Sequence, residues 1–304
     1  MIMAILQKLL DHKLAWLGLS LIAIVVLTAI FAPLIAPHDP LAVDLMQKLQ
    51  PPSAAFPLGT DHLGRCILSR LIYGARVSLS ISLVVIALTT TISLVVGLIA
   101  GYVGGRVDSW LMRVCDVFLA FPALILSLAI VGIWGAGVGN LIFALAITHW
   151  AGYARIVRSR VLSVKESDFI QAAIVSGASS LPIMFKHILP FTIAELAILT
   201  SLDISHMILH IAGLSFLGLG IQPPTPEWGA MINDGREYFR RQPELMLYPG
   251  LMIFITTLAF NIVGDVLRDK YRTKVVRLAE TGFDAHLYSE TLSADSQNHT
   301  ERYS

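Results

Sequence analysis

The stretch RIVRSRVLSVKESDFIQAAIVSGASSLPIMFKHILP, residues 155–190, joins two long apolar runs of the chain. It is not a simple polar connector, because small and apolar side chains recur at helical spacing from Phe169 to Ser176. Ser167 (or its neighbour Asp168) can cap the start of this helix. Gly177 suits the left-handed position that often ends a helix. The pattern predicts a short helix followed at once by a turn.

A second short helix is expected directly after that turn. Ser180 can cap it, Pro182 is tolerated in its first turn, and Pro190 marks the entry into the next apolar run. The loop at about 156–190 is therefore predicted to form a helix–turn–helix elbow at the membrane face. Its apolar side chains either pack on the chain's own bundle or dock on a soluble partner, and spacing alone leaves both readings open.

The composition around this elbow is that of a membrane protein. Hydrophobic residues make up 55% of the chain and charged residues 14%, with a mean hydropathy of +0.71. Soluble domains carry roughly 25% charged residues, so this chain cannot cover itself with polar surface. Its net charge of +1 favours no class of partner, and no nucleic-acid-binding signature is present. Two cysteines form no disulfide framework.

Apolar runs of about 20 residues predict an all-α, polytopic protein with about six transmembrane helices. The first run is too long for a signal peptide and is interpreted as an uncleaved anchor. We expect an N-terminal anchor and outer segment at 1–76, a transmembrane core at 77–270 and a disordered polar tail at 278–304. The predicted spans are Leu14–Ala36, Val77–Tyr102, Cys115–Trp134, Val138–Ala154, Phe191–Leu217 and Tyr248–Leu267.

The distribution of positive charge predicts the orientation of these spans. With both termini in the cytoplasm, most of the 22 Lys and Arg residues fall in cytoplasmic segments. The opposite orientation would place most of them outside. We therefore expect a multi-pass protein with cytoplasmic N- and C-termini.

The elbow resembles the EAA loop of ABC importer permeases, whose pattern is Glu-Ala-Ala, three residues, Gly, then nine residues before Ile-x-Leu-Pro. Gln171 replaces the glutamate of that pattern, and His187 stands at its isoleucine position. The loss of the glutamate weakens any claim of a specific ion pair with a partner. The positions that fit the pattern are Gln171, Ala172, Ala173, Gly177, Leu189 and Pro190.

Two further motifs resemble one branch of these permeases. PLGTDHLGRCILSRLIYGARVSLSIS (57–82) resembles a segment of dipeptide, oligopeptide and nickel permeases, with Cys66 where that branch usually has aspartate. FLGLGIQPPTPEWGAMIND (216–234) resembles the signature that follows their fifth span. The resemblance covers roughly residues 55–270.

This resemblance implies a type I ABC importer permease fold in a bacterial inner membrane. It implies a second homologous permease subunit, two ATPase subunits and an extracytoplasmic substrate-binding protein as partners, besides membrane lipid. The chain has no GxxxxGK[ST] phosphate loop, so ATP and Mg²⁺ are expected in the partner subunits. We expect no catalytic residue and no cofactor on this chain; the elbow would transmit ATPase movement to the pore.

The run SLDISHMILHIAGLSFLGLG, residues 201–220, bears on the substrate. Asp203, His206 and His210 fall on one face of a helix, and His149 adds an imidazole from the preceding span. Ionisable groups inside spans normally face a wet cavity or the bundle interior, so we expect a translocation path here. His206 and His210, at i and i+4, could transiently hold a metal, since imidazole suits Ni, Cu and Zn.

The bland alternative is that these groups are interhelical hydrogen-bond glue. The stretches HWAGYARIVRS (149–159) and LDISHMILHIAGLSFLGLG (202–220), however, resemble the nickel-type branch more than the dipeptide type, which favours nickel ion as substrate. A metal–chelator complex, a dipeptide or oligopeptide substrate, and a membrane metalloenzyme are the alternatives. Neither HExxH nor GxSxG supports the enzyme.

The outer loop after span five contains two aromatic residues, Trp228 and Tyr238, near a group of arginines. They are interpreted either as anchors of a contact with a binding protein or as part of an aromatic belt. The arginines, which could meet acidic groups on such a partner, are Arg236, Arg240 and Arg241.

Overall fold

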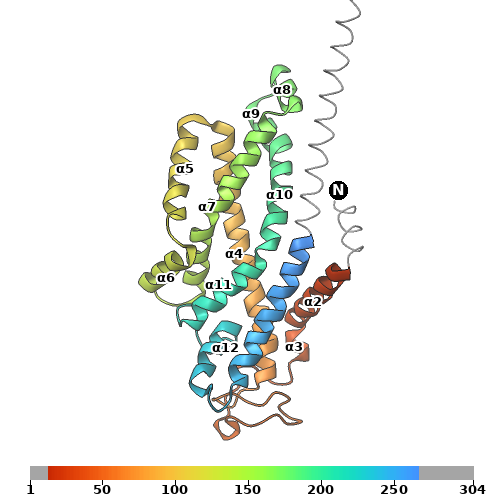
Figure 1. Ribbon diagram of the computed structural model, residues 1–304, viewed down its shortest axis with the longest axis vertical. Helices are drawn as coiled ribbons and strands as arrows, with labels where there is room; N and C mark the ends of the chain where they lie inside the picture. Colours follow the sequence, from red (N-terminus) through yellow and green to blue (C-terminus); the bar gives the residue numbers. More distant parts are fainter. Residues whose placement is uncertain (1–12, 267–304) are drawn as a thin grey trace, which may run out of the picture.

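The computed structural model describes residues 13–266, and all regular elements in this range are helical (Figure 1). The all-α prediction is confirmed, while the tail expected at 278–304 lies outside the described residues. The helices are α2 (Lys13–Ile30), α3 (Ala32–Ile35), η1 (Leu45–Gln47), α4 (Ile67–Val103), α5 (Gly105–Leu119), α6 (Ala123–Trp134), α7 (Val138–Lys165), α8 (Asp168–Val175), α9 (Ser180–Pro182), η2 (Ile183–Ile188), α10 (Leu189–Leu202), α11 (Ile204–Phe216), α12 (Trp228–Gly235), η3 (Arg236–Tyr238) and a C-terminal helix (Glu244–Val266).

Two of the described helices, α4 and the C-terminal helix, are each long and apolar enough to cross a membrane. The pair α5 and α6 meets the same test when taken together. The first predicted span corresponds to α2 with α3, the fourth to α7, and the fifth to α10 with α11. The protein is thus polytopic, although several of its spans are interrupted or carry charged ends.

The span predicted at Cys115–Trp134 is not one continuous helix. The chain bends by 84° between α5 and α6. Pro122 explains the break, since proline disfavours helical backbone in the preceding residue and here directly precedes α6. Charges on α5 also tie it sideways to α7: Asp108 accepts from the guanidinium of Arg158, and Asp116 pairs with Arg155.

The centre of the bundle is the contact between α4 and α7. At Gly97 and Gly101 of α4 the two backbones approach so closely that no side chain would fit without a shift. Ser93 Oγ donates to the Trp150 carbonyl oxygen at 2.8 Å across the same interface. Small residues four apart are the usual device for close helix packing in lipid.

The expected continuous helix through residues 201–220 is interrupted at one residue. α10 ends at Leu202, α11 starts at Ile204, and Asp203 forms the junction, with its amide donating to the Thr200 carbonyl oxygen at 3.1 Å. The polar face nevertheless survives, because Asp203 also accepts a hydrogen bond from the side chain of His206 in the first turn of α11.

The bundle has two distinct ends (Figure 1). α8 and α9 lie at one, called here the elbow end. At the other lie α12 and two loop segments, residues 37–66 and 222–243, called here the cap. Trp228 of the cap is fully buried, and its Nε1 donates to the Leu71 carbonyl oxygen at 3.1 Å. The interpretation of Trp228 as an interface anchor is therefore wrong, since its large ring packs inside the subunit.

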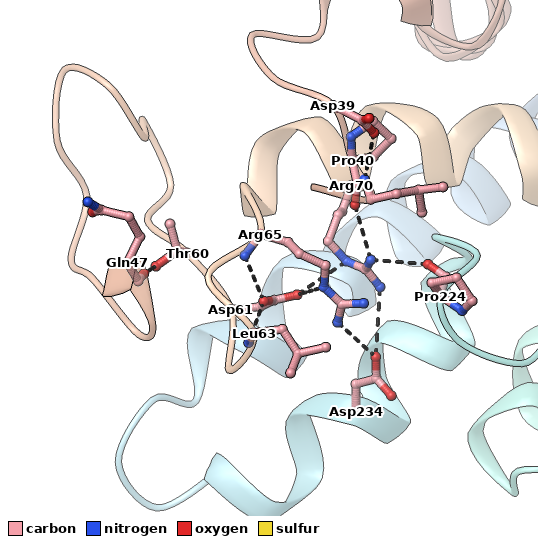
Figure 2. Close-up of polar contacts among 11 residues, drawn as sticks. Asp39, Pro40, Gln47, Thr60, Asp61, Leu63, Arg65, Arg70, Pro224 and Asp234 are labelled. Carbon is pink, nitrogen blue, oxygen red and sulfur yellow. Dashed lines mark hydrogen bonds and ion pairs between the residues drawn. The ribbon is translucent and has the colours of Figure 1, made fainter. Parts of the chain in front are cut away.

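A buried cluster of four charges joins the two segments of the cap (Figure 2). Arg65 and Arg70, 1% and 2% exposed, lie between the carboxylates of Asp61 and Asp234. Arg65 Nε is 2.7 Å from Asp61 Oδ2, and its NH2 is 3.4 Å from Asp234 Oδ2. Two positive and two negative side chains cancel, which is the condition under which buried ions are tolerated.

Candidate functional site

The elbow is anchored by a buried apolar seam. Ile170 of α8 and both Ile183 and Ile188 of η2 are at most 1% exposed. They pack in one cluster with apolar side chains of α4, α7 and α10. The elbow is thereby packed against both of the helices that it joins, α7 and α10.

The opposite face of the elbow is apolar and uncovered. Phe169, Leu181 and Phe185 are about half to two-thirds exposed, and Val175 is 88% exposed. They belong to α8, α9 and η2, and α8 and α9 lie at the elbow end of the bundle (Figure 1). A surface connector that packed only on its own bundle would bury such side chains, so this arrangement favours the docking reading.

Gln171, Ala172 and Ala173 lie on α8 near its junction with α7. Gln171 Nε2 donates to the Lys165 carbonyl oxygen at 3.0 Å, which satisfies one of the free carbonyls at the end of α7. Ala172 is exposed and Ala173 is half-buried. Gln171 therefore has a local structural task that requires no partner charge.

The remaining three predicted elbow residues mark its bends. Gly177 has a φ of +83°, the left-handed conformation expected from the sequence. Leu189 is half-buried and begins α10, with Pro190 next to it in the first turn. Proline is tolerated there because the first helical amides have no partner within the helix.

On the docking reading of the elbow, Gly177→Asp is expected to release the ATPase partner while leaving this subunit folded. A Cβ at position 177 would meet nothing within 4 Å in the subunit, so the internal cost is only the left-handed backbone, about 1–2 kcal/mol and less for aspartate. A charge at the tip of an apolar docking face would weaken the contact about tenfold or more. Co-purification of the ATPases with this subunit measures the effect.

Gly105→Asp is the matched control for this variant. Gly105 also has a positive φ, +56°, and open space around its Cβ direction, but it is the first residue of α5 and lies outside the elbow. Normal ATPase co-purification and transport with Gly177→Asp, or an equal loss with Gly105→Asp, would contradict a docking role for the elbow.

A cavity of about 360 Å³ lies between three helical segments of the bundle. Its walls come from α7, from the junction between α10 and α11, and from the C-terminal helix. We call it the chamber. Its lining residues are His149, Gly152, Tyr153, Ile156, Leu199, Asp203, His206, Asn261, Gly264 and Asp265.

The side chain of Asp203 links two helices at the chamber. Its Oδ1 accepts from His206 Nδ1 at 3.1 Å, and its Oδ2 accepts from the hydroxyl of Tyr153 on α7. The carboxylate thus bridges α7 and α11 at the point where the fifth span is broken. Part of this network serves as interhelical glue, as the alternative reading of the sequence proposed.

The imidazoles keep one nitrogen available. Nδ1 of His149 lies 2.9 Å from the Leu145 carbonyl oxygen, and Nδ1 of His210 lies 2.9 Å from the His206 carbonyl oxygen. A carbonyl only accepts, so Nδ1 carries the proton and Nε2 keeps a lone pair in the neutral ring. The two rings meet edge to face with centroids 4.8 Å apart, which places His210 beside the chamber although it does not line it.

A closed metal site is not formed by these residues. Among the side chains that the structure describes, no group of three or more His, Cys, Asp or Glu is close enough together to hold a metal ion. The side chain of His206 is 63% exposed. The structure brings together His149, Asp203, His206 and His210, but as separate polar groups around open space.

Tyr153, Asn261 and Asp265 are chamber residues that the sequence reasoning missed. Tyr153 lies one helical turn beyond His149 on α7, so that spacing was the available signal. Asn261 accepts from Ser205 Oγ at 2.6 Å, which joins the C-terminal helix to α11. Asp265, near the end of the C-terminal helix, falls inside the predicted span Tyr248–Leu267, whose apolar pattern gives it no role.

Comparison with known proteins places this architecture in a family. Residues 93–277 match the model of the binding-protein-dependent transport system inner membrane component, and residues 3–52 match the N-terminal TM domain of oligopeptide transport permease C.

Full-length relatives agree with these matches. The nickel transport system permease protein NikC of Escherichia coli K12 is 49% identical over 83% of this chain and 91% of its own length. The metal-staphylopine import system permease protein CntC of Staphylococcus aureus is 42% identical over 88% and 92%. The dipeptide transport system permease protein DppC of Alkalihalophilus pseudofirmus is 40% identical over 88% of both chains.

These relatives are permease subunits of multi-component importers, which are non-catalytic membrane components. The helical bundle, the broken spans and the exposed elbow agree with that role. The chain therefore belongs to the family of binding-protein-dependent transport system inner membrane components, as an ABC importer permease of the dipeptide, oligopeptide and nickel branch.

Proposed function

We propose that this permease passes nickel ion, or a nickel complex, across the bacterial inner membrane by alternating access. The observation that carries the proposal is that two imidazoles and a carboxylate, those of His149, His206 and Asp203, line one chamber, with the ring of His210 against that of His149. Ionisable groups at membrane depth are costly and are normally retained along substrate paths.

The chemistry of these groups suits a passing metal rather than a stored one. Imidazole nitrogen is a good ligand for Ni²⁺, and the free Nε2 atoms of His149 and His210 supply it. A conduit must also release its cargo, so binding has to be weak and distributed over several sites. Separate donors around a roomy chamber meet that requirement better than a tight cage would.

The names of the relatives give different transported substances. One is a nickel permease, one imports a metal–staphylopine complex and one imports dipeptides. The His-containing chamber favours a metal over a peptide. A metal bound to a chelator and a plain peptide are the competing cargoes, and uptake measurements separate them.

The energy for transport would come from two ATPase subunits that use ATP and Mg²⁺. We place them at the elbow end, on the exposed apolar face of α8 and α9, with both chain termini in the cytoplasm. A second homologous permease would complete the pore. An extracytoplasmic binding protein would dock at the cap, where the exposed residues Arg236, Arg240 and Arg241 can meet acidic groups.

Uptake by cells that express the complete importer tests the cargo. We expect accumulation of radioactive nickel from nickel chloride, with no accumulation of labelled dipeptide. Uptake of nickel only when a chelator is supplied would favour the complex, and dipeptide uptake without nickel uptake would overturn the proposal.

Replacing both His206 and His210 by alanine is expected to reduce nickel uptake about tenfold at limiting nickel, since a lost interaction of about 1.4 kcal/mol is a factor of ten. Assembly should persist, because His206 is mostly exposed, the hydrogen bond of His210 stays within its own helix, and its contact with another helix is the edge of one ring, that of His149. His38→Ala, which alters a histidine of the cap, is the control. Unchanged nickel uptake in the double variant would show that these two histidines have only a structural role.

A further inference from the structure

The charges that line the chamber have one sign. Asp203 contributes a carboxylate from the junction of α10 and α11, and Asp265 contributes a second from the C-terminal helix. Neither lysine nor arginine occurs among the described residues that line the chamber. The wall is therefore acidic on two sides and neutral elsewhere, apart from imidazoles that keep free nitrogens.

The carboxylate of Asp203 is engaged at both oxygens by hydrogen-bond donors. His206 donates to Oδ1, and the Tyr153 hydroxyl donates to Oδ2. Both donors come from side chains of the chamber wall. A cation that enters the chamber would compete with them for the same lone pairs. Asp265 is exposed, lines the chamber and forms no ion pair with another described residue, so a cation would meet it directly.

We propose that Asp203 and Asp265 form a site for a hydrated divalent cation in the chamber, and that the Tyr153 hydroxyl holds the Asp203 carboxylate when the cation is absent. This inference rests on the proposed metal cargo and adds the residues that would select its charge. Tyr153 acts here as a positioning residue, because it works through Asp203.

Hydration of the ion agrees with the geometry. The described residues do not gather three ligands closely enough to strip a metal of its waters. A buried water needs a cavity volume of roughly 10–15 Å³. A chamber of about 360 Å³ therefore has room for a cation together with its shell of water molecules. Recognition through water is also weak enough to allow release.

The position of this contact connects it to the elbow. Tyr153 lies on α7, which leads into α8, and Asp203 directly follows α10, which starts from η2. The elbow therefore holds the far ends of both helices that the Tyr153–Asp203 hydrogen bond joins. A displacement of the elbow by the ATPases would change the separation of these two side chains and so the access of the cation to Asp203.

Nickel binding to the purified complete complex tests the proposal. The probe is nickel chloride, measured by equilibrium dialysis on complex carrying a tag without histidine. A divalent cation about 5 Å from a carboxylate in water gains enough Coulomb energy for roughly a tenfold change in affinity. Asp265→Asn should weaken binding by about that factor. Tyr153→Phe should strengthen binding about threefold, because it removes a competing hydrogen bond.

Matched controls are available at positions outside the chamber. Glu237→Gln removes an exposed carboxylate from η3, and Tyr73→Phe removes a hydroxyl from α4; neither should change affinity. Equal affinity in Asp265→Asn and Glu237→Gln, or weaker binding in a Tyr153→Phe complex of normal elution profile, would overturn the inference.

Failure here is distinguishable from failure of the proposed cargo. If nickel binding depends on Asp265 but the complex imports only peptide, the cation site is supported and nickel is ruled out as the cargo. If the complex takes up nickel but Asp265→Asn does not change nickel binding, nickel is supported as the cargo and the cation site is ruled out.

Discussion

Asp61→Ala is expected to prevent assembly of the importer, with a loss of stability of about 3–5 kcal/mol, the usual result of removing one partner from a buried ion pair. Asp61 lies between Arg65 and Arg70, both almost completely buried. Its Oδ1 also accepts from the Leu63 and Arg65 amides, at 2.9 and 3.0 Å. Without this carboxylate, two guanidinium groups share Asp234 alone, and the loop that precedes α4 loses its fixed shape.

The yield of monodisperse complex and its thermal midpoint measure this effect. Asp39→Ala is the control, because Asp39 is exposed and its carboxylate accepts only a local amide, that of Leu41, at 2.8 Å. Combining Asp61→Ala with Arg65→Met should recover part of the loss, since it restores charge balance. Normal yield in Asp61→Ala alone would show that the cluster is not required for assembly.

The ion pairs of this cluster could not be predicted from the sequence. The segment 57–82 was identified as a motif, but its Asp61, Arg65 and Arg70 gave no indication of Asp234 as a partner. Asp234 lies 169 residues from Arg65. Helical or strand periodicity reports only local neighbours, so a partnership across the fold cannot be read from spacing.

Local signals, by contrast, predicted the elbow well. Gly177 has the left-handed backbone expected of it, and α8 and α9 begin within a residue of the predicted caps. Both features depend on backbone preferences of a few adjacent residues, which a sequence contains. The exposure of Phe169 and Val175 was not decidable in advance, because burial depends on what packs above the helix.

The candidate path was predicted in part for the same reason. Asp203, His206 and His210 share a face because a helix fixes their offsets, and the break at Asp203 leaves that face intact. The contribution of Tyr153 and Asp265 depends on how α7 and the C-terminal helix are placed against α11. Only the tertiary packing shows that these helices share one chamber.

Gly97→Leu is expected to abolish transport by forcing α4 away from α7. A Cβ at position 97 would lie 2.5 Å from the Cβ of Val157 and 2.6 Å from the Ala154 carbonyl oxygen. The second contact is with backbone, which cannot turn aside as a flexible side chain could. Overpacking usually costs about 1–3 kcal/mol, and a clash with backbone lies at or above the upper part of that range.

The physical consequence reaches the chamber because α7 carries one of its walls. Separation of the helices would break the hydrogen bond from Ser93 Oγ to the Trp150 carbonyl oxygen, and it would move His149 and Tyr153 with α7. Loss of monodisperse complex, or of nickel uptake by whatever complex remains, is the expected readout.

Gly132→Leu provides the matched control, because Gly132 lies in the apolar helix α6 and a Cβ there would meet nothing within 4 Å. It adds the same apolar side chain to a span of this protein without touching the α4–α7 contact. Gly97→Ala should fall between the two, since it adds the clashing Cβ but no further bulk. Wild-type yield and uptake in Gly97→Leu would mean that α4 and α7 can separate without cost, and close packing at Gly97 would then have no part in holding the chamber together.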